Sequence, residues 1–159
     1  MKKGRIAIGL ILFSCSFFLL GYFRTYVFLN INERASLIYF KEQYPPFPGF
    51  LGAFEAYSYA QLNNLKWVLT FLFTITFASV SAFAIYVAFK QKALTYLTLG
   101  LYGFVFLISL LFMAIGLAYS PFYTHGFNIS RSLIHFEQTP MIAIVLFLSI
   151  YYYKKDTHT

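Results

Sequence analysis

The sequence predicts an all-α integral membrane protein with four transmembrane helices and short amphipathic helices in its external loops. Three observations carry this prediction. The chain of 159 residues is 60% hydrophobic and only 11% charged, whereas soluble domains contain roughly 25% charged residues. Its apolar residues gather in long segments, and about 20 such residues let a helix cross a hydrocarbon core of about 30 Å. Basic residues border these segments. We therefore expect a single membrane domain over residues 1–159.

Four segments are expected to cross the bilayer: residues 6–24, 67–89, 96–119 and 140–153. The second and third contain no charged residue. The fourth is short, about 20 Å at 1.5 Å per residue, so it crosses only if its helix starts upstream or if the bilayer thins. Thr139 followed by Pro140 is a typical helix-start signal. Two geometries remain open, a new helix starting at Pro140 or one long helix from Asn128 that is kinked there.

Lysine and arginine near the ends of spans predict the orientation, because they stay on the cytoplasmic side. Seven of the twelve basic residues fall on one side if four spans exist. They are Lys2, Lys3, Arg5, Lys90, Lys92, Lys154 and Lys155. The other five are dispersed over the outer side, mostly within the external loops 25–66 and 120–139. We therefore expect both termini in the cytoplasm. Topology also explains the net charge of +7 better than nucleic-acid binding does, so no nucleic acid is expected as a partner.

The first segment has rival interpretations that involve its basic start and its cysteine. A removable signal peptide is disfavoured, because no small-x-small cleavage site follows Leu20. The run from Leu12 to Cys15 loosely resembles a lipobox, in which the cysteine becomes lipidated. The apolar residues that follow differ from the polar tether of lipoproteins, so we favour a cysteine that is buried and inert inside a helix.

The loop 25–66 is too long for a plain connector. Three prolines and a glycine between residues 45 and 49 forbid a continuous helix there. Before this break, Asn30 or Asn32 is expected to cap a short helix, with Arg34 on its polar side. After the break, residues 51–65 mix aromatic and polar side chains. Both pieces are predicted to be helices that lie at the membrane surface.

The second loop, 120–139, supplies the candidate site. Gly126 offers a turn, and a helical pattern begins at Asn128, which shares a polar stripe with Arg131 and His135. Because the fourth span is short, His135 and Glu137 are expected at or just below the outer interface. Ionisable groups at this depth are costly and usually face partners. The sequence therefore predicts a polar cluster at the outer interface, made of Arg24, Arg131, His135 and Glu137.

Within that cluster, Arg24 is expected to pair with Glu137 across the helix bundle. The alternative is that these long polar side chains remain in the headgroup region, where water and lipid phosphate satisfy them.

The sequence predicts no catalytic residue, no metal site and no cofactor. His125 and His135 lie ten residues apart, which is a poor spacing for zinc, and the serines lack a nucleophile elbow. No acidic residue is expected in the middle of a span, which argues against a proton-coupled or cation-coupled transporter. Gly100 and Gly103 lie inside an apolar segment, where small residues allow close contact between helices.

Three patches of sequence carry a family resemblance. They are Arg24 at the end of the first span, Lys66–Thr70 at the start of the second, and Ser130–Met141 before the fourth. In these patches and in its layout, the chain resembles the exosortase F system-associated proteins of the Bacteroidetes. These are small multi-span proteins encoded beside a membrane sorting transpeptidase. The resemblance implies an accessory role in a bacterial inner membrane, and it brings no catalytic residues with it.

Two functions follow as expectations. The first is a non-enzymatic polytopic membrane protein that acts as an accessory subunit of a membrane-embedded, protein-sorting system. Its partners are then the lipid bilayer and another membrane protein. The alternative is a small membrane enzyme or carrier that acts on a lipid or a lipid-linked substrate at the outer interface. In that case Arg24, Arg131 and His135 grip a phosphate and Glu137 acts as a base.

Overall fold

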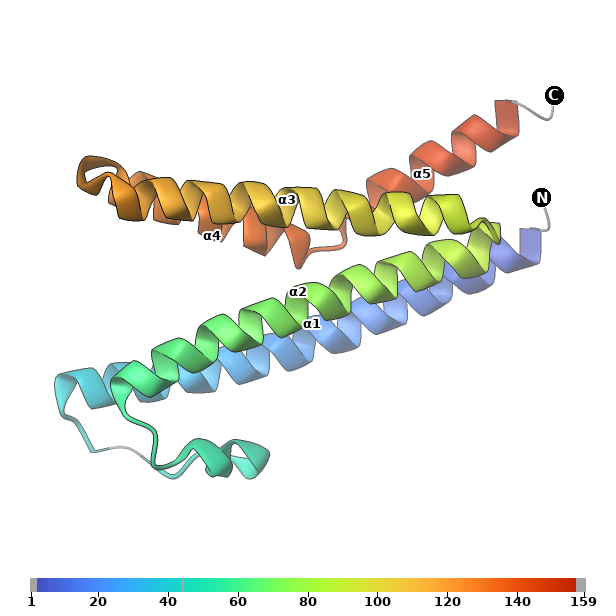
Figure 1. Ribbon diagram of the computed structural model, residues 1–159. Helices are drawn as coiled ribbons and strands as arrows, with labels where there is room; N and C mark the ends of the chain where they lie inside the picture. The colour runs from blue at the N-terminus through green and yellow to red at the C-terminus, as the bar shows by residue number, and fades with distance from the viewer. Residues whose placement is uncertain (1–2, 44, 157–159) are drawn as a thin grey trace. The chain divides into compact units, whose positions relative to one another are not determined.

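The computed structural model describes residues 3–43 and 45–156, and the described chain is helical apart from its connections (Figure 1). Its α-helices are α1 (Lys3–Phe40), α2 (Tyr59–Phe89), α3 (Lys92–Ala118), α4 (Tyr123–Glu137) and α5 (Met141–Asp156), with 3-10 helices η1 (Gly49–Phe54) and η2 (Ser120–Phe122). By length and hydropathy α1, α2 and α3 could each cross a membrane, and α4 with α5 adds a fourth span if that bent pair crosses as one. The predicted all-helical class is confirmed, and against the four predicted spans the structure has three, or up to four, helical elements that could cross a membrane.

The residue contacts divide the chain into two compact units, which we describe separately. Unit 1 comprises Met1–Phe18 and Thr74–Thr159, and unit 2 comprises Leu19–Phe73. Each unit therefore takes part of α1 and part of α2. The candidate site of the sequence analysis is split by this division, because Arg24 belongs to unit 2 whereas Arg131, His135 and Glu137 belong to unit 1.

In unit 2, α1 continues without interruption to Phe40, so the prediction of a separate short helix capped at Asn30 or Asn32 is wrong. Asn30 lies in the helix interior, where its Nδ2 donates to the Tyr26 carbonyl at 2.8 Å. The helix continues because its buried face is apolar at helical spacing. That face packs against the connection and α2 in a core of Val27, Ile31, Ala35, Phe47, Leu51 and Leu62.

The connection between α1 and α2 is shorter than the predicted loop 25–66. The helix ends at Phe40, and Lys41 takes the left-handed conformation (φ 58°) that commonly follows a helix C-terminus. The proline-rich break is therefore confirmed. Ser58 and Gln61 form a capping box that starts α2 at Tyr59: the Ser58 N–H donates to Gln61 Oε1 at 2.8 Å, and the Gln61 N–H donates to Ser58 Oγ at 3.4 Å.

In unit 1, α2 and α3 are joined by a tight turn, in which Lys90 is left-handed (φ 53°) and its N–H donates to the Tyr86 carbonyl at 2.7 Å. Residues from four helices pack beside this turn. They are Ile6 of α1, Ile85, Ala88 and Phe89 of α2, Leu94 of α3, and Leu146, Phe147 and Ile150 of α5. The start of α1, the α2–α3 turn and the middle of α5 consequently pack together in unit 1, and Figure 1 shows the start of α1 and this turn at the same end of the unit.

Helices α3 and α4 form a hairpin held by small residues. A Cβ atom added to Gly126 of α4 would lie 2.6 Å from the Phe112 carbonyl oxygen and 3.0 Å from the Cα of Gly116, both in α3. One turn further along α4, Ser130 Oγ lies 2.9 Å from Ser109 Oγ, and Ser109 also donates to the Ser130 carbonyl at 3.1 Å. Gly126 thus lies inside α4 rather than in the expected turn, and α4 begins at Tyr123 instead of Asn128.

A sharp bend of 52° separates α4 from α5. The side chain of Thr139 donates to the Phe136 carbonyl at 2.6 Å at the end of α4, and the Pro140 carbonyl accepts the Ile144 N–H at 2.8 Å to start α5. Of the two geometries that the sequence left open, the structure has the new helix that starts after Pro140.

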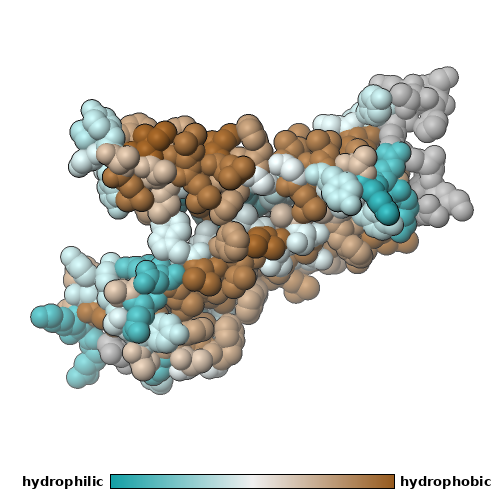
Figure 2. Space-filling view, viewed as in Figure 1, coloured by the Kyte–Doolittle hydropathy of each residue, from teal (hydrophilic) through white to brown (hydrophobic). Residues whose placement is uncertain are grey.

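Apolar side chains cover much of the outside of the described helices, as Figure 2 shows for α3. In the most apolar window of α1 and of α3, only 17% of the residues are buried inside the chain, against 39% in α2. Cys15 is one of the exposed residues of α1. The expectation of a buried cysteine is therefore wrong, although its place inside a helix is confirmed.

Candidate functional site

The strongest candidate site is a buried polar group at the break between α4 and α5. Glu137, the last residue of α4, is 0% exposed. Neither of its carboxyl oxygens has a hydrogen-bond partner among the described residues. In hydrocarbon a charged side chain costs roughly 2.5–3.5 kcal/mol or more, so a carboxyl in this position is maintained at an energetic cost.

The register of α4 explains why Glu137 points inward. Gly126, Ser130, Ile134 and Glu137 are the buried residues of this helix, and they follow one another at intervals of four, four and three, which is one face of an α-helix. The hairpin contacts of Gly126 and Ser130 turn this face toward α3. Packing at one end of α4 thereby fixes the direction of the carboxyl at the other end.

Polar side chains of two other helices lie around the break. Gln138, next to Glu137, donates its Nε2 to Thr74 Oγ1 of α2 at 3.0 Å. Tyr102 of α3 is 2% exposed, and its hydroxyl lies 2.9 Å from Ser81 Oγ of α2. The Tyr102 hydroxyl is within electrostatic range of the Glu137 carboxyl.

The backbone of Phe106 in α3 also interacts electrostatically with the Glu137 carboxyl, but it does not form a hydrogen bond of ordinary geometry with either oxygen. The α2 and α3 groups close to the break are therefore hydroxyls, an amide and backbone dipoles. No ion pair with Glu137 is found among the described side chains.

The other predicted site residues lie elsewhere. Arg131 and His135 are exposed on α4, and at 100° per residue they lie about 120° and about 160° around the helix from Glu137. Arg24 belongs to unit 2, where its guanidinium lies over the ring of Phe28, 5.2 Å from the centroid. The single cluster at the outer interface, including the pair of Arg24 with Glu137, therefore stays a prediction, and unit 1 itself does not gather Arg131 and His135 with the carboxyl.

The position of Glu137 bears on one expectation. Ser120–Glu137 and Met141–Tyr153 together pass as a single broken span or a re-entrant loop, and Glu137 lies at the break in that element. If the bent pair crosses as one span, an acidic residue lies inside a membrane segment, whereas none was expected in the middle of a span. The helical spacing of Gly126, Ser130 and Ile134 already indicated which face of α4 is buried. Small residues, however, do not form the apolar stripe by which such a face is recognised in a sequence.

A second polar group organises the connection in unit 2. Arg34, placed on a polar surface by the sequence analysis, is only 4% exposed. Its guanidinium forms an ion pair with Glu55, donates to the Pro45 carbonyl at 2.8 Å, and lies over the ring of Phe47 at 5.0 Å. The Phe47 N–H donates to Glu55 Oε2 at 2.8 Å. These bonds hold both sides of the proline-rich break against α1.

The charge state of Glu55 follows from these bonds. The hydrogen bond from the Phe47 N–H, together with the hydrogen bond and charge of Arg34, lowers the pKa of the Glu55 carboxyl, and partial desolvation opposes this only in part. We interpret the arrangement as structural, because its bonds join residues of the connection to one another and to α1.

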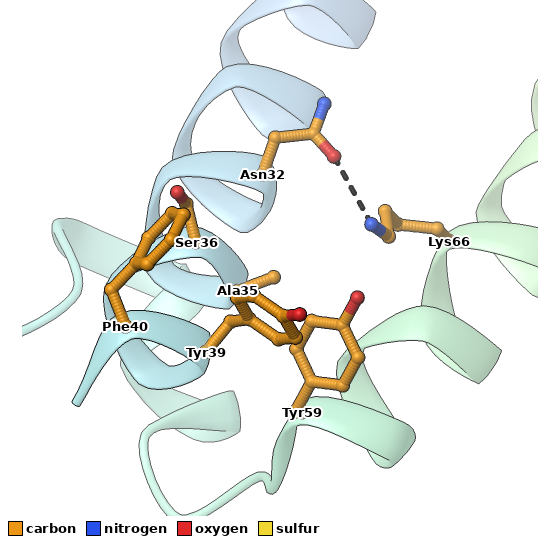
Figure 3. Close-up of a pocket in the computed structure, with 7 residues that line it drawn as sticks. All are labelled: Asn32, Ala35, Ser36, Tyr39, Phe40, Tyr59 and Lys66. Atoms are coloured by element: carbon orange, nitrogen blue, oxygen red, sulfur yellow. Dashed lines mark hydrogen bonds between the residues drawn. The ribbon is translucent and has the colours of Figure 1, made fainter.

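A crevice of about 270 Å³ lies between the end of α1 and the start of α2. Figure 3 shows Lys66 of α2 pointing toward Asn32 of α1, to which its Nζ donates at 3.2 Å, with the rings of Tyr39 and Tyr59 side by side. Ala35, Ser36 and Phe40 complete its lining. Tyrosine and lysine in this combination are typical of the membrane–water interface, and the volume is below the usual range of small-molecule sites.

Among the described residues, no group of three or more histidine, cysteine, aspartate or glutamate side chains is placed to hold a metal ion. Comparison of the chain with protein-family models, with curated proteins and with solved structures found no match. The geometry of the two units is therefore the basis for the function proposed below.

Proposed function

We propose that the protein is a non-enzymatic polytopic membrane protein that acts as a subunit of a membrane-embedded assembly, with the lipid bilayer and a helix of another membrane protein as its partners. The observation that carries the proposal is an uncovered face on α3. Its exposed residues Tyr96, Gly100, Gly103, Leu107 and Leu110 follow one another at intervals of four, three, four and three. This spacing places them on one side of the helix.

Glycines on such a face favour a second helix over lipid alone. No heavy atom lies within 4 Å of a Cβ atom added to Gly100 or to Gly103. Membrane helices associate through small residues because these let two backbones approach closely. Within unit 1 the chain already uses this device at Gly126, where α4 packs on α3. The glycines of the outer face offer a comparable contact that no described residue of this chain occupies.

We further propose that α1, α2, α3 and the α4–α5 pair cross the membrane with both termini in the cytoplasm. The contact cluster beside the α2–α3 turn supports this orientation, because it brings the start of α1 and that turn together with the middle of α5, which continues from there to the C-terminal end of the helix. Lys90 and Lys92 lie in or next to the turn, and the other basic residues of that side flank the two termini. The positive-inside rule assigns such an end to the cytoplasm.

The length of α1 supports an outer position for the connection. At 1.5 Å per residue, α1 is about 57 Å long, which exceeds the hydrocarbon core of about 30 Å. A helix that starts near the cytoplasmic surface therefore continues beyond the opposite one. The proline-rich connection, with its Arg34–Glu55 ion pair, then lies outside the hydrocarbon.

The assignment to a protein-sorting system in a bacterial inner membrane rests on the resemblance to exosortase F system-associated proteins. It names one expected partner, the membrane sorting transpeptidase of that system. The alternative function, an enzyme or carrier for lipid-linked substrates, needs Arg24, Arg131, His135 and Glu137 around one substrate. It receives less support, because the Glu137 carboxyl is enclosed while Arg131 and His135 are exposed on other sides of α4.

The test is co-purification of the tagged full-length protein from its native membranes in mild detergent, for the wild type and two matched variants. Gly103→Leu fills the open face of α3, and Gly21→Leu adds the same side chain to α1, where a Cβ atom also meets nothing within 4 Å. Overfilling a helix contact costs about 1–3 kcal/mol, which corresponds to about 5-fold to 150-fold in association. We expect Gly103→Leu alone to lose the membrane partner.

Equal recovery of the partner with both variants, or a wild-type protein that is recovered without a membrane partner, contradicts the proposal. The thermal stability of the purified variants is measured in parallel, so that loss of a partner is separated from loss of the fold. The sorting assignment is contradicted separately if the recovered partner is not the transpeptidase.

A further inference from the structure

Glu137 is chemically distinctive because its side chain is fully buried while its carboxyl oxygens lack hydrogen bonds. The side chain is 0% exposed and both carboxyl oxygens lack hydrogen-bond partners among the described residues. Buried carboxylates in proteins are normally paired with a cation or with several donors. A carboxyl that remains without either is stable in an apolar interior only in its neutral form, with a proton on one oxygen.

Among the described residues, no helix that packs around the break places a cationic side chain beside the Glu137 carboxyl. Tyr102 is the titratable group of α3 within electrostatic range, and α2 contributes the uncharged side chains of Thr74 and Ser81. The first turn of α5 is apolar where it is buried, at Ile142 and Ala143. The buried residues of α1 in this unit include the phenylalanines Phe13 and Phe17. On α4 itself, Arg131 and His135 lie on other sides of the helix, as described above.

The helix break places polar backbone groups next to Glu137. The first N–H groups of a helix and the last carbonyls of the preceding one have no partners within their own helices. At this break, Thr139 and Gln138 satisfy some of the α4 carbonyls. Discontinuous helices in membranes commonly place such groups, together with ionisable side chains, at the sites where ions bind.

We propose that Glu137 is an intramembrane proton-binding site of unit 1, which takes up a proton from water and releases it to water when the α4–α5 break opens. A proton is the ligand that fits these surroundings, because the described side chains offer the carboxyl neither a cation nor a group of metal ligands. The step is an acid–base reaction: one O–H bond of Glu137 forms or breaks, and hydronium or water carries the proton. No oxidant, reductant or other co-reactant takes part.

The experiment is a pH titration of the purified full-length protein in lipid vesicles, followed by attenuated-total-reflection infrared spectroscopy. A protonated carboxyl in an apolar environment gives a carbonyl band that is separate from the bands of carboxylates and amides. We expect this band in the wild type at neutral pH, its reversible loss at alkaline pH, and an unchanged helical amide band throughout.

The variants identify the group. Glu137→Gln should remove the band, whereas Glu33→Gln, an equal change at an exposed glutamate of α1, should leave it unchanged. Should Glu137→Gln fail to fold, Glu137→Asp provides the second variant and should shift the band. A wild type without the band at neutral pH, or a band that disappears only when the helices unfold, overturns the proposal.

A membrane-soluble carbodiimide gives an independent readout of opening. The protonated carboxyl adds across one C=N bond, so that its oxygen bonds to the central carbon and its proton moves to a nitrogen. The adduct then rearranges to an N-acylurea with no leaving group. Labelling at Glu137 that increases on warming supports opening of the break, and absence of labelling at all temperatures contradicts release to water. These measurements need no partner, so they can fail while the proposed subunit function stands, and the reverse also holds.

Discussion

One glutamate in each unit shows how differently the two units treat the same side chain. Glu55 of unit 2 is 44% exposed, accepts a hydrogen bond from the Phe47 N–H, and pairs with Arg34. Glu137 of unit 1 is fully buried, and its carboxyl oxygens have no hydrogen-bond partner among the described residues. Glu55 is therefore held as an anion by its neighbours, whereas the surroundings of Glu137 favour the neutral acid.

Exposure of a carboxyl and its importance to the fold are therefore separate properties. The exposed carboxylate is the one that organises structure, because it anchors a nearly buried guanidinium and, through it, the connection of unit 2. The enclosed carboxyl makes no such bond. Its burial follows from the packing of α4 on α3.

The first prediction makes the same change at both positions. Glu55→Gln removes the charge that faces the nearly buried guanidinium of Arg34, so it should destabilise the connection of unit 2. Glu137→Gln replaces a neutral carboxyl by a neutral amide of similar shape and should change the free energy of unfolding by less than about 1 kcal/mol. Detergent-denaturation curves of the two variants measure this difference. Equal losses of unfolding free energy at both sites would contradict the difference between the two glutamates.

The second prediction concerns the packing that buries Glu137. In Gly126→Ala, the new methyl group meets the Phe112 carbonyl oxygen at 2.6 Å, so α3 and α4 must separate at a cost of about 1–3 kcal/mol. Gly103→Ala, in open space on α3, should instead stabilise the monomer by up to about 1 kcal/mol. The free energies of unfolding of both variants test this. Stabilisation by Gly126→Ala would show that the hairpin is not closely packed there.

A smaller effect is expected for the serine pair of the same hairpin. Ser109 and Ser130 bond to each other, and hydrogen bonds between membrane helices contribute about 0.6 kcal/mol on average. We expect Ser109→Ala to cost about this much and Ser130→Ala to add little more, because the bond is already lost. Fully additive losses in a double-mutant cycle would indicate that the two side chains act independently.

The smallest effect is a pH dependence confined to unit 2. The folded pKa of Glu55 lies below the ordinary carboxyl value of 4.5, first because of the Phe47 N–H and then because of Arg34. Its contribution to stability is therefore fully present above pH 4.5 and is lost as the pH falls through the lowered folded value. Solvent screening keeps it modest. Proteolysis of the connection at residues 41–58 should accelerate in that acidic range, and Glu55→Gln should abolish the dependence.

The helices themselves were largely predictable, whereas their ends and inward faces were not. Segments such as residues 67–89 are too apolar for any other structure. The sequence did not predict that the helix continues to Phe40, because Asn30 and Arg34 interrupt the apolar pattern and an arginine is expected at the surface. Its burial depends on Glu55, twenty-one residues away, and no local pattern reveals such a partner. The capping box at Ser58 and Gln61 was readable from the sequence and would have placed the start of α2 correctly.

The candidate site, too, was predictable only in part. The sequence singled out Glu137 and the break at Pro140, because an ionisable residue and a proline beside an apolar segment stand out by type alone. It did not place the carboxyl inside the unit or separate it from Arg131 and His135. Those outcomes depend on which face of α4 packs against α3.

That the chain is helical and apolar enough for a membrane follows from the sequence, since hydrophobicity and helix length are properties of single segments. That one glutamate is bonded and another is enclosed follows only from the folded chain. Each result depends on contacts between residues far apart in the chain, Arg34 with Glu55 in unit 2 and Gly126 with Gly116 in unit 1. Such contacts are fixed by close packing, to which small residues contribute by their lack of volume rather than by any pattern that the sequence displays.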